Sequence, residues 1–250
     1  MKNQIAVTIL TKDCGDTLLA TLRSLQEFPE VVVLDTGSTD DTIEIAEEFP
    51  NVKIHHAEFK GFGPMHNEAT NLASSDWILS IDSDEILSPE LVREIQELPL
   101  DPTCVYSIQR DNYFNGKKIR CCAGWYPDPV VRLYNRKKTK FSSDAVHEKI
   151  LREGLRLVPL KHTLKHTPYR TISDFLEKMQ KYSTLFAEQN RGKKRSSLFR
   201  ALVHGIGAFI KNYFFKRGIF GGQEGFIISL YNSQTAYYKY LKLAERVSTK

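Results

Sequence analysis

Short apolar runs separated by helix-forming stretches occupy the first hundred residues, and this alternation constrains the fold more than any other feature of the chain. The runs cover residues 5–10, 31–34, 52–55 and 77–81. Runs of this length indicate buried strands, and helices between successive strands favour a mostly parallel sheet. We therefore expect an α/β fold with a Rossmann-like sheet flanked by helices.

Two of the intervening stretches carry helix-start signals. Ser38, followed by Asp41 three residues later, resembles a capping box, and residues 88–90 (Ser-Pro-Glu) place a cap, a proline and an acid in one first turn. The preceding strands therefore end at Asp35 and Asp82. Because ligands bind at the carboxyl edge of open α/β sheets, we expect both aspartates at one crevice.

The pattern changes after Pro99. Strand-like residues 105–110 and 117–121 flank Asn115-Gly116, a strong hairpin signal, and residues 130–134 indicate another strand. From Thr171 onward apolar residues recur at helical spacing, and a last helix is expected over residues 225–247. We predict an α/β domain over residues 1–170, with halves 1–100 and 101–170, and a helical extension over residues 171–250.

Asp82-Ser83-Asp84 spaces two carboxylates so that both can point the same way from an extended segment. Such oxygen ligands suit a hard cation, Mg²⁺ or Mn²⁺, that substrate phosphates also hold. The alternative interpretation is a solvated acidic turn. The apolar strand before the motif and the helix start after it favour the metal site.

Two further clusters offer chemistry. Asp35, at a strand end before Gly37, can accept hydrogen bonds from ribose hydroxyls or a base edge. In the segment 144–150, Glu148 can act as a general base, and His147 can be a neutral imidazole ligand that completes a carboxylate site. The zinc-protease pattern HExxH is absent, because position 151 is Leu.

Four cysteines without a CxxC pair indicate reduced thiols in a cytosolic protein. The N-terminus lacks the features of a signal peptide, and no stretch of about 18 apolar residues indicates a transmembrane helix. We therefore expect a cytoplasmic protein whose active site faces the cytosol.

The segment 191–217 contains eight basic residues and no acid, interleaved with aromatic and aliphatic side chains. This combination favours contact with an anionic membrane surface. The alternatives are a helix packed on the domain with a solvated basic rim, and a nucleic-acid patch. No nucleic-acid motif supports the last alternative, so we expect no nucleic-acid partner.

An ordered series of motifs carries a family resemblance: "TILTKDCGDTLLATLRSL", "VVVLDTGSTDDTIEIAEEF", "FKGFGPMHNEATNLASSDWILSIDSDE", "GWYPDPVVRLYNR" and "VHEKI". Together they resemble the family 2 glycosyltransferases of the GT-A fold. Within that family the chain is most similar to the bacterial lipopolysaccharide-core enzymes that add glucose to the first inner-core heptose. The resemblance spans nearly the whole chain.

The resemblance implies a UDP-sugar donor bound by residues 1–100. It implies that Thr11 and Asp35 contact uridine and that Asn67 lies beside the nucleotide. Asp82 would face the ribose or the metal, and Asp84 would coordinate the ion that bridges the two phosphates. A hexose, in particular glucose, would then pass to a lipid-linked saccharide such as the lipopolysaccharide inner core.

The resemblance also implies inversion of the anomeric centre by a single displacement. Glu148 is the expected base, and Asp144 is the alternative, because this chain has His147-Glu148 where many family members carry a Glu-Asp pair. The Q-x-x-R-W motif of processive synthases is absent, which favours a single transfer.

Trp125, Asp128 and Arg132 are expected on the acceptor side, in residues 101–170. An indole face suits sugar C–H surfaces, and a guanidinium suits anionic groups. The alternatives are that Trp125 belongs to the core and that Arg132 is a strand surface residue.

Two other functions compete with the transferase. A haloacid-dehalogenase-like phosphatase also places a D-x-D after an apolar strand, but on its first strand, whereas here the motif follows the fourth. A non-enzymatic binder of membrane surfaces would explain the segment 191–217 but not the strand-end aspartates.

Overall fold

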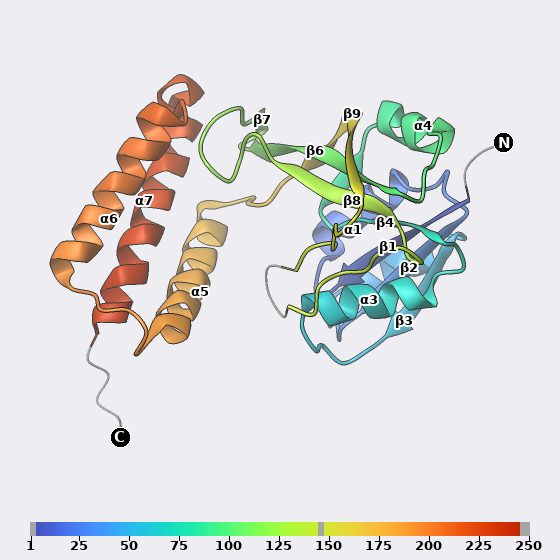
Figure 1. Ribbon diagram of the computed structural model, residues 1–250, viewed down its shortest axis with the longest axis horizontal. Helices are drawn as coiled ribbons and strands as arrows, with labels where there is room; N and C mark the ends of the chain where they lie inside the picture. The colour runs from blue at the N-terminus through green and yellow to red at the C-terminus, as the bar shows by residue number, and fades with distance from the viewer. Residues whose placement is uncertain (1–3, 145–147, 246–250) are drawn as a thin grey trace. The chain divides into compact units, whose positions relative to one another are not determined.

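The four apolar runs form the parallel part of a sheet in the computed structural model, which describes residues 4–144 and 148–245 (Figure 1). The strands are β1 (Ile5–Thr11), β2 (Glu30–Asp35), β3 (Val52–His56) and β4 (Trp77–Ser80). β1 pairs in parallel with both β2 and β4, and β2 pairs in parallel with β3. The strands predicted from the sequence are confirmed.

The other strands extend this sheet in antiparallel fashion. They are β5 (Glu85–Leu87), β6 (Cys104–Phe114), β8 (Pro129–Asn135) and β9 (Arg156–His166), and the order is β3-β2-β1-β4-β8-β6-β9-β5. A short strand β7 (Lys117–Lys118) pairs with β6 around Asn115 and Gly116, whose φ angles are 50° and 74°. The predicted Asn-Gly hairpin is therefore confirmed, but its second strand ends at Lys118 instead of continuing to Cys121.

Helices cover both faces of the parallel strands. Alternate β1 side chains, Ile5, Val7 and Ile9, join a core with residues of α1 (Gly15–Arg23) and α4 (Pro89–Glu97). On the opposite face Leu34 packs against α3 (Phe62–Leu72). This two-sided burial explains why the strands are apolar throughout rather than alternating.

The two expected helix caps differ in outcome. The Ser88 hydroxyl accepts a hydrogen bond from the backbone N–H of Leu91 at 3.2 Å, so this cap is confirmed. The capping box at Ser38 is wrong, because α2 (Thr42–Glu47) begins only after Asp41. The Ser38 hydroxyl instead donates to Asp35 Oδ1 at 2.5 Å.

The chain divides into two compact units. The first comprises Met1–Asp111 and Pro129–His166, and the second comprises Asn112–Asp128 and Thr167–Lys250. The second unit contains α5 (Ile172–Asn190), α6 (Leu198–Ile210), a π-helical turn η1 (Lys211–Phe215), a 3₁₀ turn η2 (Gly218–Gly221) and α7 (Gly222–Ala244).

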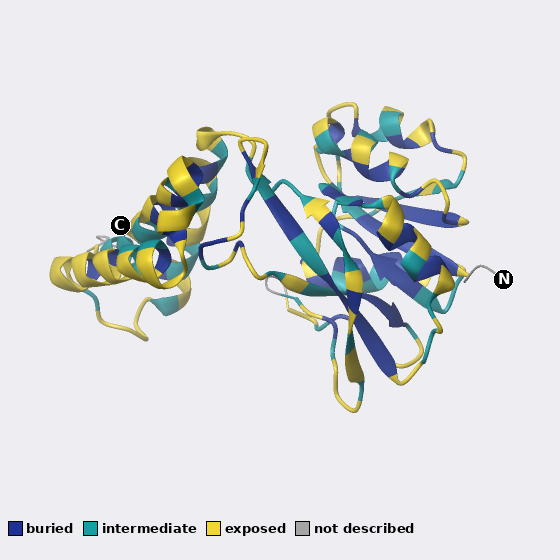
Figure 2. Ribbon diagram, turned by 90° about the horizontal axis from the view of Figure 1, so that it is seen from above, coloured by how far each residue is buried: buried dark blue, intermediate teal, exposed yellow. Residues whose placement is uncertain are grey.

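Helix α7 packs against both α5 and α6, and Figure 2 shows exposed residues along much of these helices. An aromatic cluster that includes Phe114, Trp125 and Phe175 joins the segment 112–128 to the helices. Within residues 4–144 and 148–245, no helix is both long enough and apolar enough to cross a bilayer.

Candidate active site

Asp35 is the last residue of β2 and contacts Thr11, the last residue of β1. Thr11 lies opposite Asp35 in the strand register, and its hydroxyl donates to Asp35 Oδ1 at 3.1 Å. The backbone N–H groups of Gly37 and Ser38 donate to Oδ2 at 2.9 and 3.0 Å. Burial alone would raise the pKa of Asp35, but these hydrogen bonds outweigh it and lower the pKa. The structure thus brings the two predicted uridine contacts together around an ionised carboxylate.

Asp82 follows β4 and belongs to a buried ion cluster with Arg132 and Glu85. The Arg132 guanidinium donates to one oxygen of each carboxylate. The Glu85 side chain is fully buried, that of Arg132 is 8% exposed, and that of Asp82 is 37% exposed. Arg110 Nη1 lies 3.4 Å from Glu85 and 3.7 Å from Asp82. Two arginines therefore share the charge of two carboxylates at the tip of the strand.

Burial and the opposite charges shift the pKa values of this cluster's members. Burial alone would raise the pKa of Asp82, but the charge of Arg132 outweighs it and lowers the pKa to about 2. For Glu85 burial dominates, and its pKa lies above the ordinary value. Burial opposes the charged form of Arg132, yet the two carboxylates raise its pKa. Asp82 and Arg132 are therefore both charged at neutral pH.

Asp84 has a different partner. Its Oδ2 lies 3.4 Å from Nε2 of His166, the last residue of β9. The antiparallel pairing of β5 with β9 sets His166 opposite Glu85 and so beside Asp84. The Asp84 side chain is 30% exposed and that of His166 is 12% exposed. His166 was not predicted as a site residue, because only this long-range register brings it to the motif.

Glu148 lines the same cavity as Asp82. The cavity has a volume of about 480 Å³, and its wall also includes Arg110, Lys149 and Arg152. Glu148 Oε1 lies 3.9 Å from Nε2 of the buried His66. A carboxylate that can accept a proton therefore shares one cavity with the strand-end aspartate and with four basic side chains, Arg132 included.

His66 was also not predicted as a site residue. Its ring stacks on Phe141 with 4.3 Å between ring centres, and Nδ1 lies 3.3 Å from the Ser80 hydroxyl. Burial lowers its pKa to about 4, so the ring is neutral at pH 7. A neutral imidazole behind Glu148 offers a polar contact that does not alter the charge of the cavity.

Asp144 and Asn67 form hydrogen bonds with residues that precede Glu148 in the chain. Asp144 is exposed, and its carboxylate accepts a hydrogen bond from the Ser142 hydroxyl at 2.8 Å. Both polar atoms of the Asn67 amide bond the backbone of Phe141, at 2.9 and 3.0 Å. Of the two expected bases, only Glu148 lines the cavity. Contact between Asn67 and a nucleotide stays a prediction.

The residues expected on the acceptor side are divided between the units. Trp125 is 4% exposed and stacks on Tyr169 in the second unit, which favours the core interpretation. Asp128, in the same unit, accepts from the Asn112 amide at 2.9 Å. Arg132 lies in the first unit and is buried against carboxylates, which contradicts the alternative interpretation of a strand surface residue. Acceptor contact by these three residues stays a prediction.

The residues near Asp84 fit a divalent ion. A carboxylate and an imidazole supply one oxygen and one nitrogen ligand, and Mg²⁺ and Mn²⁺ sites commonly take their remaining ligands from phosphate and water. In the described part of the chain, no three His, Cys, Asp or Glu side chains converge as a ready-made metal site. His147, expected as a ligand, lies outside the described residues. Asp82 is paired with arginine, so Asp84 and His166 are the better pair.

The fold defines a class: a GT-A-like α/β protein, with Asp35 and Asp82 at the carboxyl edge of its parallel strands. The family model of glycosyl transferase family 2 matches residues 6–154, more than half of the chain. The chain belongs to glycosyl transferase family 2, as its motifs predicted.

Individual relatives agree with this assignment. An uncharacterized glycosyltransferase of Rickettsia felis is 30% identical and aligns over 97% of this chain and 89% of its own length. The lipopolysaccharide core biosynthesis glycosyltransferase LpsC of Rhizobium meliloti is 26% identical over 92% of this chain and 87% of its own.

A solved structure supports the fold. The mannosyltransferase PcManGT of Pyrobaculum calidifontis, solved with GDP-Man and Mn²⁺, aligns with a TM-score of 0.54 at 14% identity, over 94% of this chain and 86% of its own. The α/β, GT-A type fold expected from the sequence is confirmed.

Proposed function

We propose that this protein is an inverting, metal-dependent glycosyltransferase that moves a hexose, in particular glucose, from a UDP-sugar to a lipid-linked saccharide such as the lipopolysaccharide inner core. The observation that carries the proposal is the shared cavity of Glu148 and Asp82. It combines a proton acceptor with a strand-end carboxylate at the sheet edge where family 2 enzymes bind their donor. Family membership disfavours the phosphatase and the non-enzymatic alternatives.

In the proposed transfer, residues of this chain act at each step. The Glu148 carboxylate accepts the proton of the acceptor hydroxyl, whose oxygen then bonds to the anomeric carbon from the face opposite the leaving group. The bond between that carbon and the diphosphate breaks, and UDP leaves with the electron pair. A divalent ion held by Asp84 and His166 would neutralise the charge that develops on the diphosphate.

The cavity wall also bears on the acceptor. Arg110, Lys149 and Arg152 give it a cationic character, which suits an acceptor that carries phosphate or carboxylate groups. Core saccharides of lipopolysaccharide have this chemistry, and LpsC, whose name places it in core biosynthesis, is a relative over nearly the full length. We further propose that the protein acts at the cytoplasmic face of the inner membrane, where such acceptors are presented.

A donor panel tests the reaction. The protein would be incubated with several UDP-sugars and Mn²⁺, and release of UDP by slow hydrolysis would be measured. The sugar that is released fastest identifies the donor. Failure to release UDP from every sugar, together with no thermal stabilisation by UDP and Mn²⁺, would reject the UDP-sugar proposal.

Two matched pairs of variants test the roles of the residues. Glu148→Gln should lower the rate of transfer by about 10²- to 10⁴-fold while UDP still stabilises the protein. Asp144→Asn should transfer at nearly the rate of the unmodified protein. Asp84→Asn and His166→Gln should raise the Mn²⁺ concentration needed for stabilisation by UDP. Full activity of Glu148→Gln would assign the base elsewhere, and an unchanged Mn²⁺ requirement in both metal-site variants would reject that site.

A further inference from the structure

Helix α6 buries its small residues and exposes its large apolar ones. Ala201 is fully buried, and Gly205 lies against α7, where an added Cβ would stand 3.1 Å from Tyr237 Cβ. The opposite side of α6 leaves Phe199 74% exposed and Ile206 59% exposed. This is the reverse of the usual arrangement for a water-facing helix, in which large apolar side chains enter the core.

The exposed apolar surface continues beyond the helix into η1 and η2. We call it the α6–η2 surface; its most exposed members are Leu198, Phe199, Val203, Ile206, Phe214, Phe215 and Phe220, from 52% to 84% exposed. Contiguous apolar surface of this kind on a folded protein marks an interaction site.

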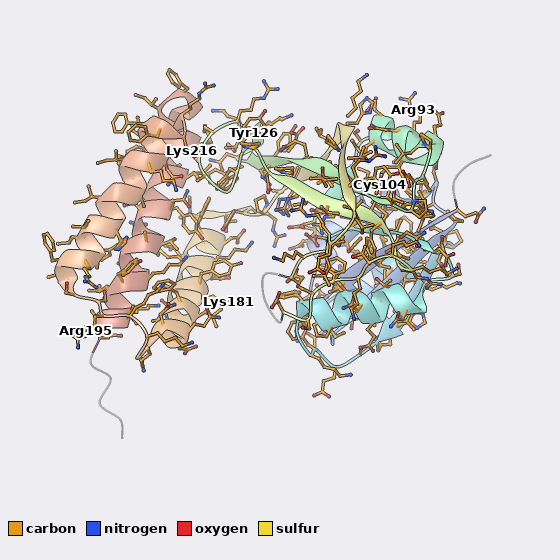
Figure 3. All side chains as sticks on the ribbon, in the orientation of Figure 1. Arg93, Cys104, Tyr126, Lys181, Arg195 and Lys216 are labelled. Atoms are coloured by element: carbon orange, nitrogen blue, oxygen red, sulfur yellow. The ribbon has the colours of Figure 1, made fainter. Side chains whose placement is uncertain are left out.

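Basic side chains border this surface, and acids are absent from its sequence. Arg195 and Lys216 lie at opposite ends of α6 (Figure 3), and no Asp or Glu occurs between Arg191 and Arg217. A protein partner with an apolar face would not require this uniform charge. An anionic bilayer matches both properties, because its interior accepts aromatic side chains and its headgroups attract Lys and Arg.

A basic cavity opens at the η2 end of the same surface. Its volume is about 700 Å³, and Lys117, Lys118, Arg120 and Arg217 line it together with Phe220. Lys117 Nζ lies 2.9 Å from Glu224, whereas in the described residues no acidic side chain lies within ion-pair distance of Arg120 or Arg217. The cavity therefore holds a surplus of positive charge.

The cavity wall is firmly built. An added Cβ at Gly221 would stand 2.6 Å from Cys121 Sγ, so η2 lies directly against the loop that carries Arg120. Phe220, which is 84% exposed, extends from this fixed turn. An aromatic side chain and two arginines are thus held beside one cavity at the edge of the α6–η2 surface.

We propose that the second unit docks on an anionic phospholipid bilayer through the α6–η2 surface, with a lipid phosphate headgroup bound in the cavity between Arg120 and Arg217. The apolar side chains enter the headgroup region, and the basic residues contact the phosphates around them. This inference goes beyond glycosyl transfer and does not depend on it, because binding to a bilayer requires no turnover. The test and the donor panel can therefore fail independently.

Co-sedimentation with vesicles tests the proposal. The full chain should bind vesicles of phosphatidylcholine mixed with phosphatidylglycerol, and bind phosphatidylcholine alone much more weakly. Arg120→Gln with Arg217→Gln should weaken binding by about 30-fold, because each basic side chain near an anionic surface contributes roughly fivefold. Phe215→Ser with Phe220→Ser should also weaken binding, although both side chains are exposed and the fold does not need them.

The matched control removes two exposed charges elsewhere. Lys138→Gln with Lys181→Gln changes the net charge equally but leaves the cavity intact, and it should bind nearly as the unmodified chain does. Equal losses in the control and in the arginine variant, or equal binding to both kinds of vesicle, would overturn the headgroup site.

Two other outcomes would overturn the proposal. One is binding of inorganic phosphate at Arg120 and Arg217, by calorimetry, with no vesicle binding. The other is a concentration-dependent dimer in light scattering that Phe215→Ser with Phe220→Ser abolishes, again without vesicle binding.

Discussion

Replacing Arg132 by Met should lower the free energy of unfolding of the first unit by more than the removal of an exposed charge does. The guanidinium bonds both Asp82 and Glu85, and Met keeps much of the volume while it removes the charge. Glu85, whose side chain is fully buried, then loses its closest cation and keeps only Arg110, 3.4 Å away. Removal of one partner from a buried ion pair costs about 3–5 kcal/mol, and we expect a loss of free energy of unfolding in that range.

Urea denaturation at pH 7, followed by circular dichroism, measures this loss. Glu85→Gln placed on top of Arg132→Met should restore part of the stability, because it removes the buried carboxyl group that has lost its closest cation. Lys137→Met is the control: it breaks an exposed ion pair with Asp76 and should have a much smaller effect. A loss for Arg132→Met no larger than that of the control, or no recovery in the double variant, would refute the reasoning.

Three further changes probe the surroundings of the cavity and the helix cap. Folding lowers the pKa of His66 from 6.5 to about 4, so stability that is present above pH 6.5 should be lost, by roughly 3 kcal/mol, as the pH falls to 4. In a plot of the urea midpoint against pH, His66→Gln should have a smaller slope between these two pH values. An unchanged slope would contradict this prediction. Gly63→Ala places a Cβ 2.0 Å from the Ser142 carbonyl oxygen and should cost about 1–3 kcal/mol in urea unfolding and reduce transfer, whereas full activity would show that this loop adjusts freely. Ser88→Ala should cost about 1 kcal/mol because Leu91 loses its cap, and Ser88→Thr should retain most of it.

The sequence predicts the parallel half of the sheet because its strands are continuous apolar runs, which is what burial on two faces requires. It also predicts the hairpin at Asn115-Gly116, since the turn needs two residues with positive φ. Strand β9 escapes prediction, because Pro159 and several basic residues interrupt its apolar pattern. Its pairing with β6 and β5 identifies it as a strand. Local propensity carries no information about such a long-range register.

The same difference separates the predicted site residues from the missed ones. Asp35, Asp82 and Asp84 are visible because each follows an apolar run, whereas His66 and His166 reach the site through α3 and β9. The predicted cap at Ser38 failed for a related reason. A hydroxyl beside a strand-end carboxylate can bond that carboxylate, and the sequence does not show which partner it takes.

The acidic turn after β4 poses a physical problem, since three carboxylates within four residues repel one another at the tip of a buried strand. The structure resolves it by dividing the turn between two kinds of partner. Arg132 compensates Asp82 and Glu85 inside the protein, which fixes the backbone of the turn without any ion. Asp84, more exposed than Glu85, lies against the imidazole of His166, which has a lone pair for a metal when neutral. The arginine therefore compensates the two carboxylates that face the protein interior, and Asp84 is the carboxylate of this turn that the proposed function assigns to the diphosphate and its cation.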